Sequence, residues 1–196
     1  MYSYTYDEET GGILLNSTPT VFSKEPRPVY APELDLLGFD KYWKYDKQSG
    51  APYMWAESVQ YWYRGKQVAK LKGGNLYEAP EIIIPEDSEG NPVQPEPDGG
   101  TLRPVDIEGM VNKNLDLLDI IENTTVKKIV AIYEKYKSKL DIFHVAFSGG
   151  KDSAVLLDLV KRALPKGSFV VVFGDTGMEF PDTYAAVEKE KQACEE

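Results

Sequence analysis

The sequence predicts an α/β protein with a parallel sheet in its C-terminal half and a small β-rich module before it. Two mostly apolar runs, 142–147 and 169–173, are each followed at once by a glycine-containing turn and a helical pattern. Strand, turn and helix twice in succession is typical of right-handed units in a parallel sheet. All three tryptophans, in contrast, lie before residue 105, in short β-prone runs broken by glycine and proline.

The composition is that of a soluble globular protein. The chain has 196 residues, of which 42% are hydrophobic and 28% are charged. No apolar run approaches the roughly 20 residues of a membrane span, and the N-terminus has neither the basic region nor the apolar stretch of a signal peptide. We therefore expect a cytoplasmic protein with no membrane partner.

Charge and cysteine content bear on partners and metals. The chain carries 22 basic against 32 acidic side chains, a net charge of −10. An acidic molecule repels polyanions, so a nucleic-acid partner is disfavoured but left open. Cys194 is the single cysteine and His144 the single histidine, so we expect no internal disulfide and no zinc or iron–sulfur cluster held by this chain.

Composition along the chain predicts three parts. Residues 1–84 form the β-rich N-terminal module with its aromatic residues. Residues 85–105 contain five prolines and three glycines among acidic residues and are predicted to be a linker or long exposed loop. Residues 106–196 form a helical lead-in followed by two strand–helix units.

Apolar residues between 111 and 136 recur mostly at spacings of three and four, which predicts a helical lead-in. One long helix or two helices joined near Asn123 both fit this pattern. Asn123-Thr124-Thr125 also matches a glycosylation acceptor, but in a chain without a secretion signal we interpret it as a helix cap or turn.

The first glycine turn, Ser148-Gly-Gly-Lys-Asp-Ser153, joins the first strand to its helix. Gly149 and Gly150 let the backbone approach a ligand closely, and the N–H groups at a helix N-terminus favour an anion. Lys151 adds a positive charge, and the hydroxyls of the two serines can donate to phosphate oxygens. The turn therefore predicts a phosphate or sulfate site, with a tight turn that binds nothing as the alternative.

This turn is not a Walker P-loop. Val145 stands where that motif needs its first glycine, and Asp152 stands where it needs Ser or Thr after the lysine. A carboxylate does not contact phosphate favourably without a cation. We therefore assign Asp152 to stabilisation of the helix N-terminus, to bracing of the loop or to a contact through a metal ion.

The second turn follows the second strand in the segment Gly174-Asp-Thr-Gly-Met-Glu-Phe-Pro-Asp-Thr183. Ligands of open α/β sheets bind at the carboxyl ends of the strands. We therefore expect Asp175, Thr176 and Gly177 to close the other side of the site. The proline after Phe180 suits the first position of a further helix.

The two turns together resemble a known family. The first resembles the PP-loop motif Ser-Gly-Gly-x-Asp-Ser of the adenine-nucleotide alpha-hydrolase superfamily. The second resembles the Asp-Thr-Gly…Phe-Pro-x-Thr segment of the phosphoadenosine phosphosulfate (PAPS) reductase family, and the resemblance covers residues 141 to about 190. It implies a parallel-sheet PP-loop domain with an alpha-hydrolase-like fold, and it adds Phe180 and Thr183 to the nucleotide site.

The resemblance also implies a reaction and its partners. The expected ligand is an adenine nucleotide, namely ATP, adenylyl sulfate or PAPS, with Mg²⁺ left open. The expected function is a PAPS or adenylyl-sulfate reductase-like enzyme of sulfur metabolism, which would take electrons from a thioredoxin-like reductant.

Similar motifs elsewhere keep other functions open. The catalytic subunit of ATP sulfurylase and proteins linked to DNA phosphorothioation have related loops, so ATP-cleaving adenylyl transfer is an alternative, as is a nucleotide-binding module without chemistry. Reductases of the family use a cysteine in a C-terminal Glu-Cys-Gly-type motif that does not occur here. We therefore assign no catalytic residue, and we interpret Cys194 as a small buried or terminal thiol and His144 as a core residue of its strand.

Two further expectations concern the aromatic runs and the extent of the sheet. The aromatic and basic runs 41–47 and 61–66 could stack nucleic-acid bases, but half-buried β-structure is the favoured interpretation. A parallel sheet buried on both faces usually has more than two strands. We therefore expect an incomplete PP-loop sheet in the N-terminal part of a longer protein, with further strands and the catalytic cysteine downstream.

Overall fold

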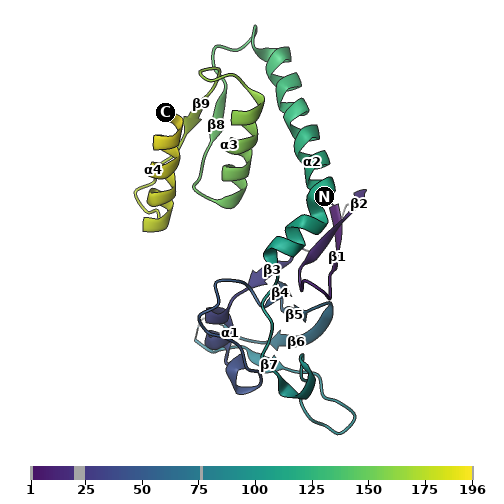
Figure 1. Ribbon diagram of the computed structural model, residues 1–196. Coiled ribbons are helices and arrows are strands. Elements are labelled where there is room, and N and C mark those ends of the chain that lie inside the picture. The colour runs from purple at the N-terminus through teal and green to yellow at the C-terminus, as the bar shows by residue number, and fades with distance from the viewer. Residues whose placement is uncertain (1, 20–24, 76, 196) are drawn as a thin grey trace. The chain divides into compact units, whose positions relative to one another are not determined.

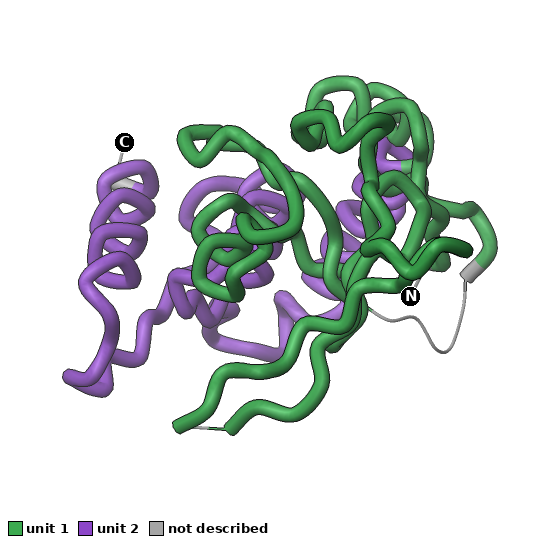
Figure 2. Tube along the Cα trace, turned by 90° about the horizontal axis from the view of Figure 1, so that it is seen from below, with its two compact units in different colours: residues 1–117 green, residues 118–196 purple. Residues whose placement is uncertain are grey.

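The computed structural model describes residues 2–19, 25–75 and 77–195 (Figure 1). Its contacts divide the chain into two compact units, residues 1–117 and 118–196 (Figure 2). The fold is mixed α/β: antiparallel sheets lie in the first unit and a parallel strand pair lies in the second. Among the described residues, no helix has both the length and the apolar character needed to cross a membrane.

The first unit is built on two antiparallel sheets. One is the hairpin of β1 (Tyr2–Tyr6) and β2 (Ile13–Pro19). The other has five strands in sequence order, namely β3 (Arg27–Val29), β4 (Met54–Glu57), β5 (Gln60–Tyr63), β6 (Lys66–Lys72) and β7 (Glu81–Ile83). The short helices α1 (Ala31–Leu37) and η1 (Phe39–Lys41) lie between β3 and β4 in the chain.

Aromatic side chains form much of the core of this unit. Phe39, Trp43, Tyr53 and Tyr61 are all buried in one apolar cluster, and Trp43 stacks on Phe39 with ring centroids 5.1 Å apart. Trp62 is half-buried and stacks on Tyr6 of the hairpin. Trp43 and Tyr61 of the two aromatic runs thus belong to the packed interior of the unit, whereas Tyr42 of the first run is exposed.

The segment rich in proline and glycine, residues 85–105, packs within this unit. It contains the short helix η2 (Pro97–Gly99), and Leu102 and Val105 are buried. The Leu102 N–H donates to the carbonyl of Lys44 over 2.7 Å. Glu96 is buried as well and accepts hydrogen bonds from Tyr63 and Arg103.

A single helix, α2 (Ile107–Tyr136), runs from the first unit into the second (Figure 1). The interpretation of Asn123-Thr124-Thr125 as a cap or turn is wrong. Asn123 Nδ2 donates to the carbonyl of Asp119 and Thr125 Oγ1 donates to that of Ile121, so both side chains bond back to the preceding turn and the helix continues.

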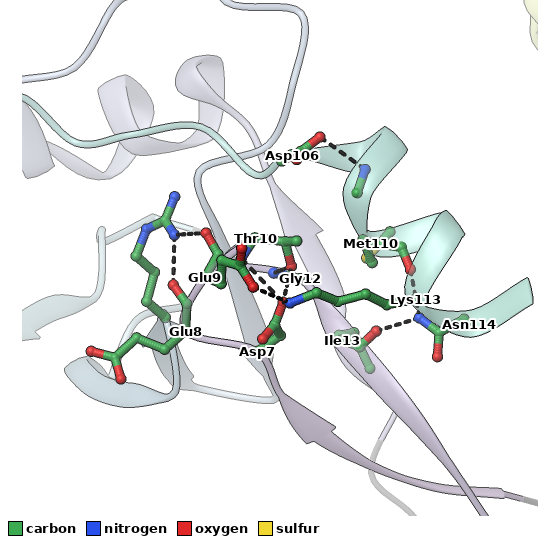
Figure 3. Close-up of polar contacts among 12 residues, drawn as sticks. Asp7, Glu8, Glu9, Thr10, Gly12, Ile13, Asp106, Met110, Lys113 and Asn114 are labelled. Carbon is green, nitrogen blue, oxygen red and sulfur yellow. Dashed lines mark hydrogen bonds and ion pairs between the residues drawn. The ribbon is translucent and has the colours of Figure 1, made fainter.

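The N-terminal end of α2 is fixed to the hairpin by Asn114 (Figure 3). Asn114 is 7% exposed. Its Oδ1 accepts from the Leu15 N–H at 2.8 Å, and its Nδ2 donates to the carbonyls of Ile13 at 2.7 Å and Met110 at 2.8 Å. One buried amide therefore satisfies backbone groups of both β2 and α2.

The second unit contains the predicted strand–helix pairs. β8 (His144–Ala146) pairs in parallel with β9 (Val170–Val172), so parallel pairing of the two apolar runs is confirmed. Helix α3 (Lys151–Ala163) follows β8, and α4 (Pro181–Glu195) follows β9. Ion pairs tie α3 to its neighbours: Lys161 to Glu190 of α4 and Arg162 to Glu122 of α2.

Only one face of this strand pair is buried. Val145 and Phe147 pack with Leu157 and Val160 of α3. The expectation that His144 is a core residue of its strand is wrong, because His144 and Ala146 are exposed. Strand alternation places them on the face opposite Val145.

Candidate functional site

The first turn has the backbone that its glycines predict. Gly149 has φ +75°, a left-handed conformation that residues with a Cβ rarely adopt. Gly150 is the N-cap of α3, with φ −86° and ψ 164° in the extended region. The chain thus leaves β8, turns sharply at Gly149 and enters α3 at Lys151.

The two serines of this turn brace it from within. The Ser148 N–H donates to Ser153 Oγ at 3.2 Å, and the two hydroxyl oxygens lie 3.1 Å apart. Ser153 Oγ also donates to the carbonyl of Gly150 at 2.9 Å. The first N–H groups of a helix have no partner within it and carry partial positive charge. The turn therefore holds an anion-attracting helix end in a defined shape.

The charged residues of the turn are exposed and contact each other. Lys151 Nζ lies 2.8 Å from Asp152 Oδ1, with side chains 76% and 90% exposed. Such a surface pair contributes little to stability. Asp152 also lies in the first turn of α3, a position that suits the role at the helix N-terminus, one of the three proposed for it.

Asp175, at the end of β9, is held by two donors. Its Oδ1 accepts from the Tyr184 hydroxyl at 2.7 Å and from the Gly177 N–H at 2.8 Å. These bonds, that from Tyr184 first, lower the pKa of the Asp175 carboxyl below its usual value. Sequence reasoning did not single out Tyr184. Its signal is its position directly after Thr183, in the first turn of the helix that Pro181 begins.

The other predicted residues of the second turn contact their own turn. Thr176 Oγ1 donates to Glu179 Oε1 at 2.9 Å. Gly177 has φ +73°. Phe180 is 80% exposed, and its carbonyl accepts from the Thr183 N–H at 2.9 Å, at the start of α4.

The two turns meet at Gly149 and Thr183. A Cβ at position 149 would lie 3.0 Å from Thr183 Cγ2 and 3.4 Å from the Thr183 carbonyl oxygen. Position 149 therefore favours glycine for two reasons, namely its positive φ and the close approach of Thr183. The structure brings the predicted residues of the first turn against those of the second through this contact.

An open pocket of about 330 Å³ lies beside both turns. Ser148 lines it from the first turn, and Gly174 and Glu179 line it from the second. The exposed face of the strands, with His144, Ala146 and Val172, contributes further walls. His144, expected in the core, is thus a pocket residue.

A larger hollow of about 580 Å³ also lies beside β9. Its walls are largely apolar and include Phe169, Val171 and Val187, with Lys161 and the half-buried Cys194 also lining it. None of the predicted nucleotide-site residues lines this hollow.

Acidic side chains near the two turns do not gather into a metal site. Across the described ranges 2–19, 25–75 and 77–195, no group of three or more His, Cys, Asp or Glu side chains is arranged to hold a metal ion.

Comparison with known proteins finds a match within the second unit. Residues 142–195, which hold both turns, match the family model of the phosphoadenosine phosphosulfate reductase domain. This segment is therefore similar to a PP-loop family. The PAPS reductase match thus begins just before β8 and ends with α4.

Two uncharacterized proteins of Methanocaldococcus jannaschii are similar to parts of the chain. One is 38% identical over 83 residues, which is 42% of this chain and 20% of that protein. The other is 46% identical over 79 residues, which is 40% of this chain and 16% of that protein. The matched stretch thus spans a fifth or less of each curated relative. No solved structure matches the chain.

Proposed function

We propose that the turn 148–153 binds the phosphate or sulfate groups of an adenine nucleotide. The observation that carries this proposal is the Gly149 turn: it has positive φ, opens onto the N-terminus of α3 and packs against Thr183 of the second turn. Backbone N–H groups at such a helix end attract anions without any side-chain charge.

The neighbouring residues fit the same ligand. Lys151 is 76% exposed, so its ammonium group can move toward a bound phosphate. The hydroxyls of Ser148 and Ser153, now bonded to each other, can exchange that contact for phosphate oxygens. Asp175 follows the parallel neighbour β9, so it belongs to the same edge of the strand pair as the turn.

The pocket of about 330 Å³ is the proposed place of the base. Small-molecule sites usually measure about 300 to 1,000 Å³ and combine apolar walls with a few polar groups. Here Ala146 and Val172 supply apolar surface, and Ser148 joins the pocket to the phosphate-binding turn.

For the whole protein we propose a PAPS or adenylyl-sulfate reductase-like role in sulfur metabolism in the cytoplasm, with a thioredoxin-like reductant as the electron donor. The family match supports the nucleotide-binding part of this role. Adenylyl transfer from ATP is the alternative, and Mg²⁺ would then accompany the nucleotide. The reductase role and the adenylyl-transfer role are distinguished by the nucleotide that binds most tightly.

We also propose that β8 and β9 belong to a larger parallel PP-loop sheet. Val170 and Val172 are 41% and 47% exposed, and an apolar hollow lies beside β9. Apolar strands of parallel sheets are normally covered on both faces. Hydrogen exchange tests this: amides of β9 should exchange more slowly in a full-length relative than in this chain, and equal rates would contradict the proposal.

Calorimetric titration of the 196-residue chain with ATP, adenylyl sulfate and PAPS, with and without Mg²⁺, tests the binding function. Binding of at least one nucleotide, lost in Gly149→Val and retained in the matched variant Gly167→Val, is the expected result. Absence of binding by all three, or wild-type affinity in Gly149→Val, would remove the assignment. Tightest binding of PAPS or adenylyl sulfate favours the reductase role, and tightest binding of ATP with Mg²⁺ favours adenylyl transfer.

A further inference from the structure

The Asp175 carboxylate is held by one of its two oxygens. Within the part of the chain that the structure describes, both of its hydrogen bonds, from the Tyr184 hydroxyl at 2.7 Å and the Gly177 N–H at 2.8 Å, fall on Oδ1. Two donors on one oxygen fix the plane of a carboxylate. The acceptor capacity of Oδ2 then remains for another partner.

Tyr184 is itself fixed in two ways. Its N–H donates to the carbonyl of Phe180 at 3.3 Å, in the first turn of α4. The edge of its ring packs on Phe173, with ring centroids 6.3 Å apart and an interplanar angle of 75°. Because Phe173 directly follows β9, the ring ties the start of α4 to the end of that strand. The Tyr184 hydroxyl is thus a preorganised donor.

The charges near Asp175 determine which group of a nucleotide can donate to its Oδ2. Glu179, the acidic side chain of the same turn, is occupied by the Thr176 hydroxyl. Two carboxylates in one turn repel a phosphate group, so the phosphates of a nucleotide belong at the other turn. The neutral hydrogen-bond donors of a nucleotide are the ribose hydroxyls and the base amine. A carboxylate at the end of a parallel strand is a known acceptor for ribose hydroxyls in nucleotide-binding sheets.

We propose that Tyr184 is a positioning residue that holds Asp175 through Oδ1 so that Oδ2 accepts a ribose hydroxyl of the bound nucleotide. This inference rests on the proposed function, because it needs a nucleotide at the turn 148–153. It adds a specificity: the site distinguishes ribonucleotides from deoxyribonucleotides, and Tyr184 supports that distinction without contacting the ligand.

The test compares ligands that differ only in the sugar. Titration of the full chain with ATP, 2′-deoxy-ATP and 3′-deoxy-ATP, without divalent metal, gives the affinity ratio for each missing hydroxyl. A hydrogen bond to a charged group predicts a preference of about tenfold for ATP over one of the two analogues. Asp175→Asn and Tyr184→Phe should each reduce that ratio several-fold. Tyr136→Phe, at an exposed position of α2 in the same unit, is the matched control and should keep the wild-type ratio.

If Tyr184 serves only the fold, the titrations give a different result. If Tyr184→Phe weakens ATP and both analogues equally, Tyr184 acts on the fold and the proposal fails. It also fails if the wild type binds ATP but does not distinguish the analogues, whereas nucleotide binding as such then stands. A preference that arises only with Mg²⁺ would assign Oδ2 to a cation and overturn the hydroxyl contact. Absence of binding by every nucleotide would overturn the proposed function and this inference together.

Discussion

Thr183, in the first turn of α4, packs directly on Gly149, in the turn before α3, so that a Cβ at position 149 would lie 3.0 Å from Thr183 Cγ2. The two turns come from successive strand–helix units, and this contact sets their separation. A change at Gly149 should therefore alter both the stability of the second unit and the shape of the site.

Gly149→Ala is the first test of this relationship. The left-handed backbone costs about 1 kcal/mol for alanine relative to glycine, and the methyl group must also displace Thr183. Gly167→Ala is the matched control, because Gly167 has φ +83° but open space around its Cβ position. Urea unfolding should show a larger loss of stability for Gly149→Ala than for Gly167→Ala. Only Gly149→Ala should also weaken nucleotide binding, and equal losses in both variants would show that the Thr183 contact is unimportant.

The second prediction concerns the charge of the turn. Lys151 is exposed and pairs with Asp152, which is exposed as well, so Lys151→Ala should leave the unfolding transition unchanged. It should weaken nucleotide binding about tenfold, the value of a hydrogen bond to a charged group. Lys166→Ala, at an exposed position beyond α3, controls for the loss of net charge. The loss of nucleotide affinity in Lys151→Ala should become smaller as the salt concentration is raised. If Lys166→Ala weakens binding by the same factor, Lys151 acts only through the net charge of the protein.

Local sequence was sufficient to predict the Gly149 turn, the order of strands and helices around it and the parallel pairing of β8 with β9. A strand, a pair of glycines and a helix are each determined by residues close together in the chain. Burial is not. The apolar run 142–147 predicts a strand but not how many of its faces are covered, which is why His144 was expected in the core and lies in a pocket instead.

Contacts between residues that are distant in the chain could not be predicted from the sequence either. Asn114 looked like one polar residue of a helical pattern, yet it bonds to Ile13 and Leu15, about a hundred positions earlier in the chain. Tyr184 lies close to Asp175 only because Pro181 starts a helix at the proper place after the strand. Asn123 shows the opposite error: its type favours caps and turns, but its side chain bonds back to the carbonyl of Asp119 and the helix α2 continues through it.

The third prediction uses two asparagines of that helix. Asn114→Ala removes the partners of the Leu15 N–H and of the Ile13 carbonyl in a buried place. Each unsatisfied group costs about 1–3 kcal/mol, so unfolding of the first unit should become easier by about 3 kcal/mol. Asn123→Ala, exposed and bonded only within α2, should change stability little, because alanine is the better helix former. A small effect at Asn114 in chemical denaturation would show that water replaces its contacts.

The last prediction follows from Asp7, whose Oδ2 accepts from Lys113 of α2 at 2.7 Å and from the Thr10 hydroxyl at 2.6 Å. Burial disfavours the charged carboxylate, but these bonds outweigh it and lower the pKa of Asp7 to about 2. A carboxyl with a lowered pKa stabilises the fold above its unfolded pKa of about 4, and that stabilisation is lost as pH falls toward the folded value. Asp7→Asn should therefore be less stable than wild type at neutral pH, and the difference should fade between about pH 4 and pH 2. Glu8→Gln, which removes the same charge at the exposed neighbouring position, should follow the wild-type pH profile. Thermal unfolding across this pH range provides the measurement, and a difference between wild type and Asp7→Asn that stays constant with pH would show that Asp7 acts through shape and not through its charge.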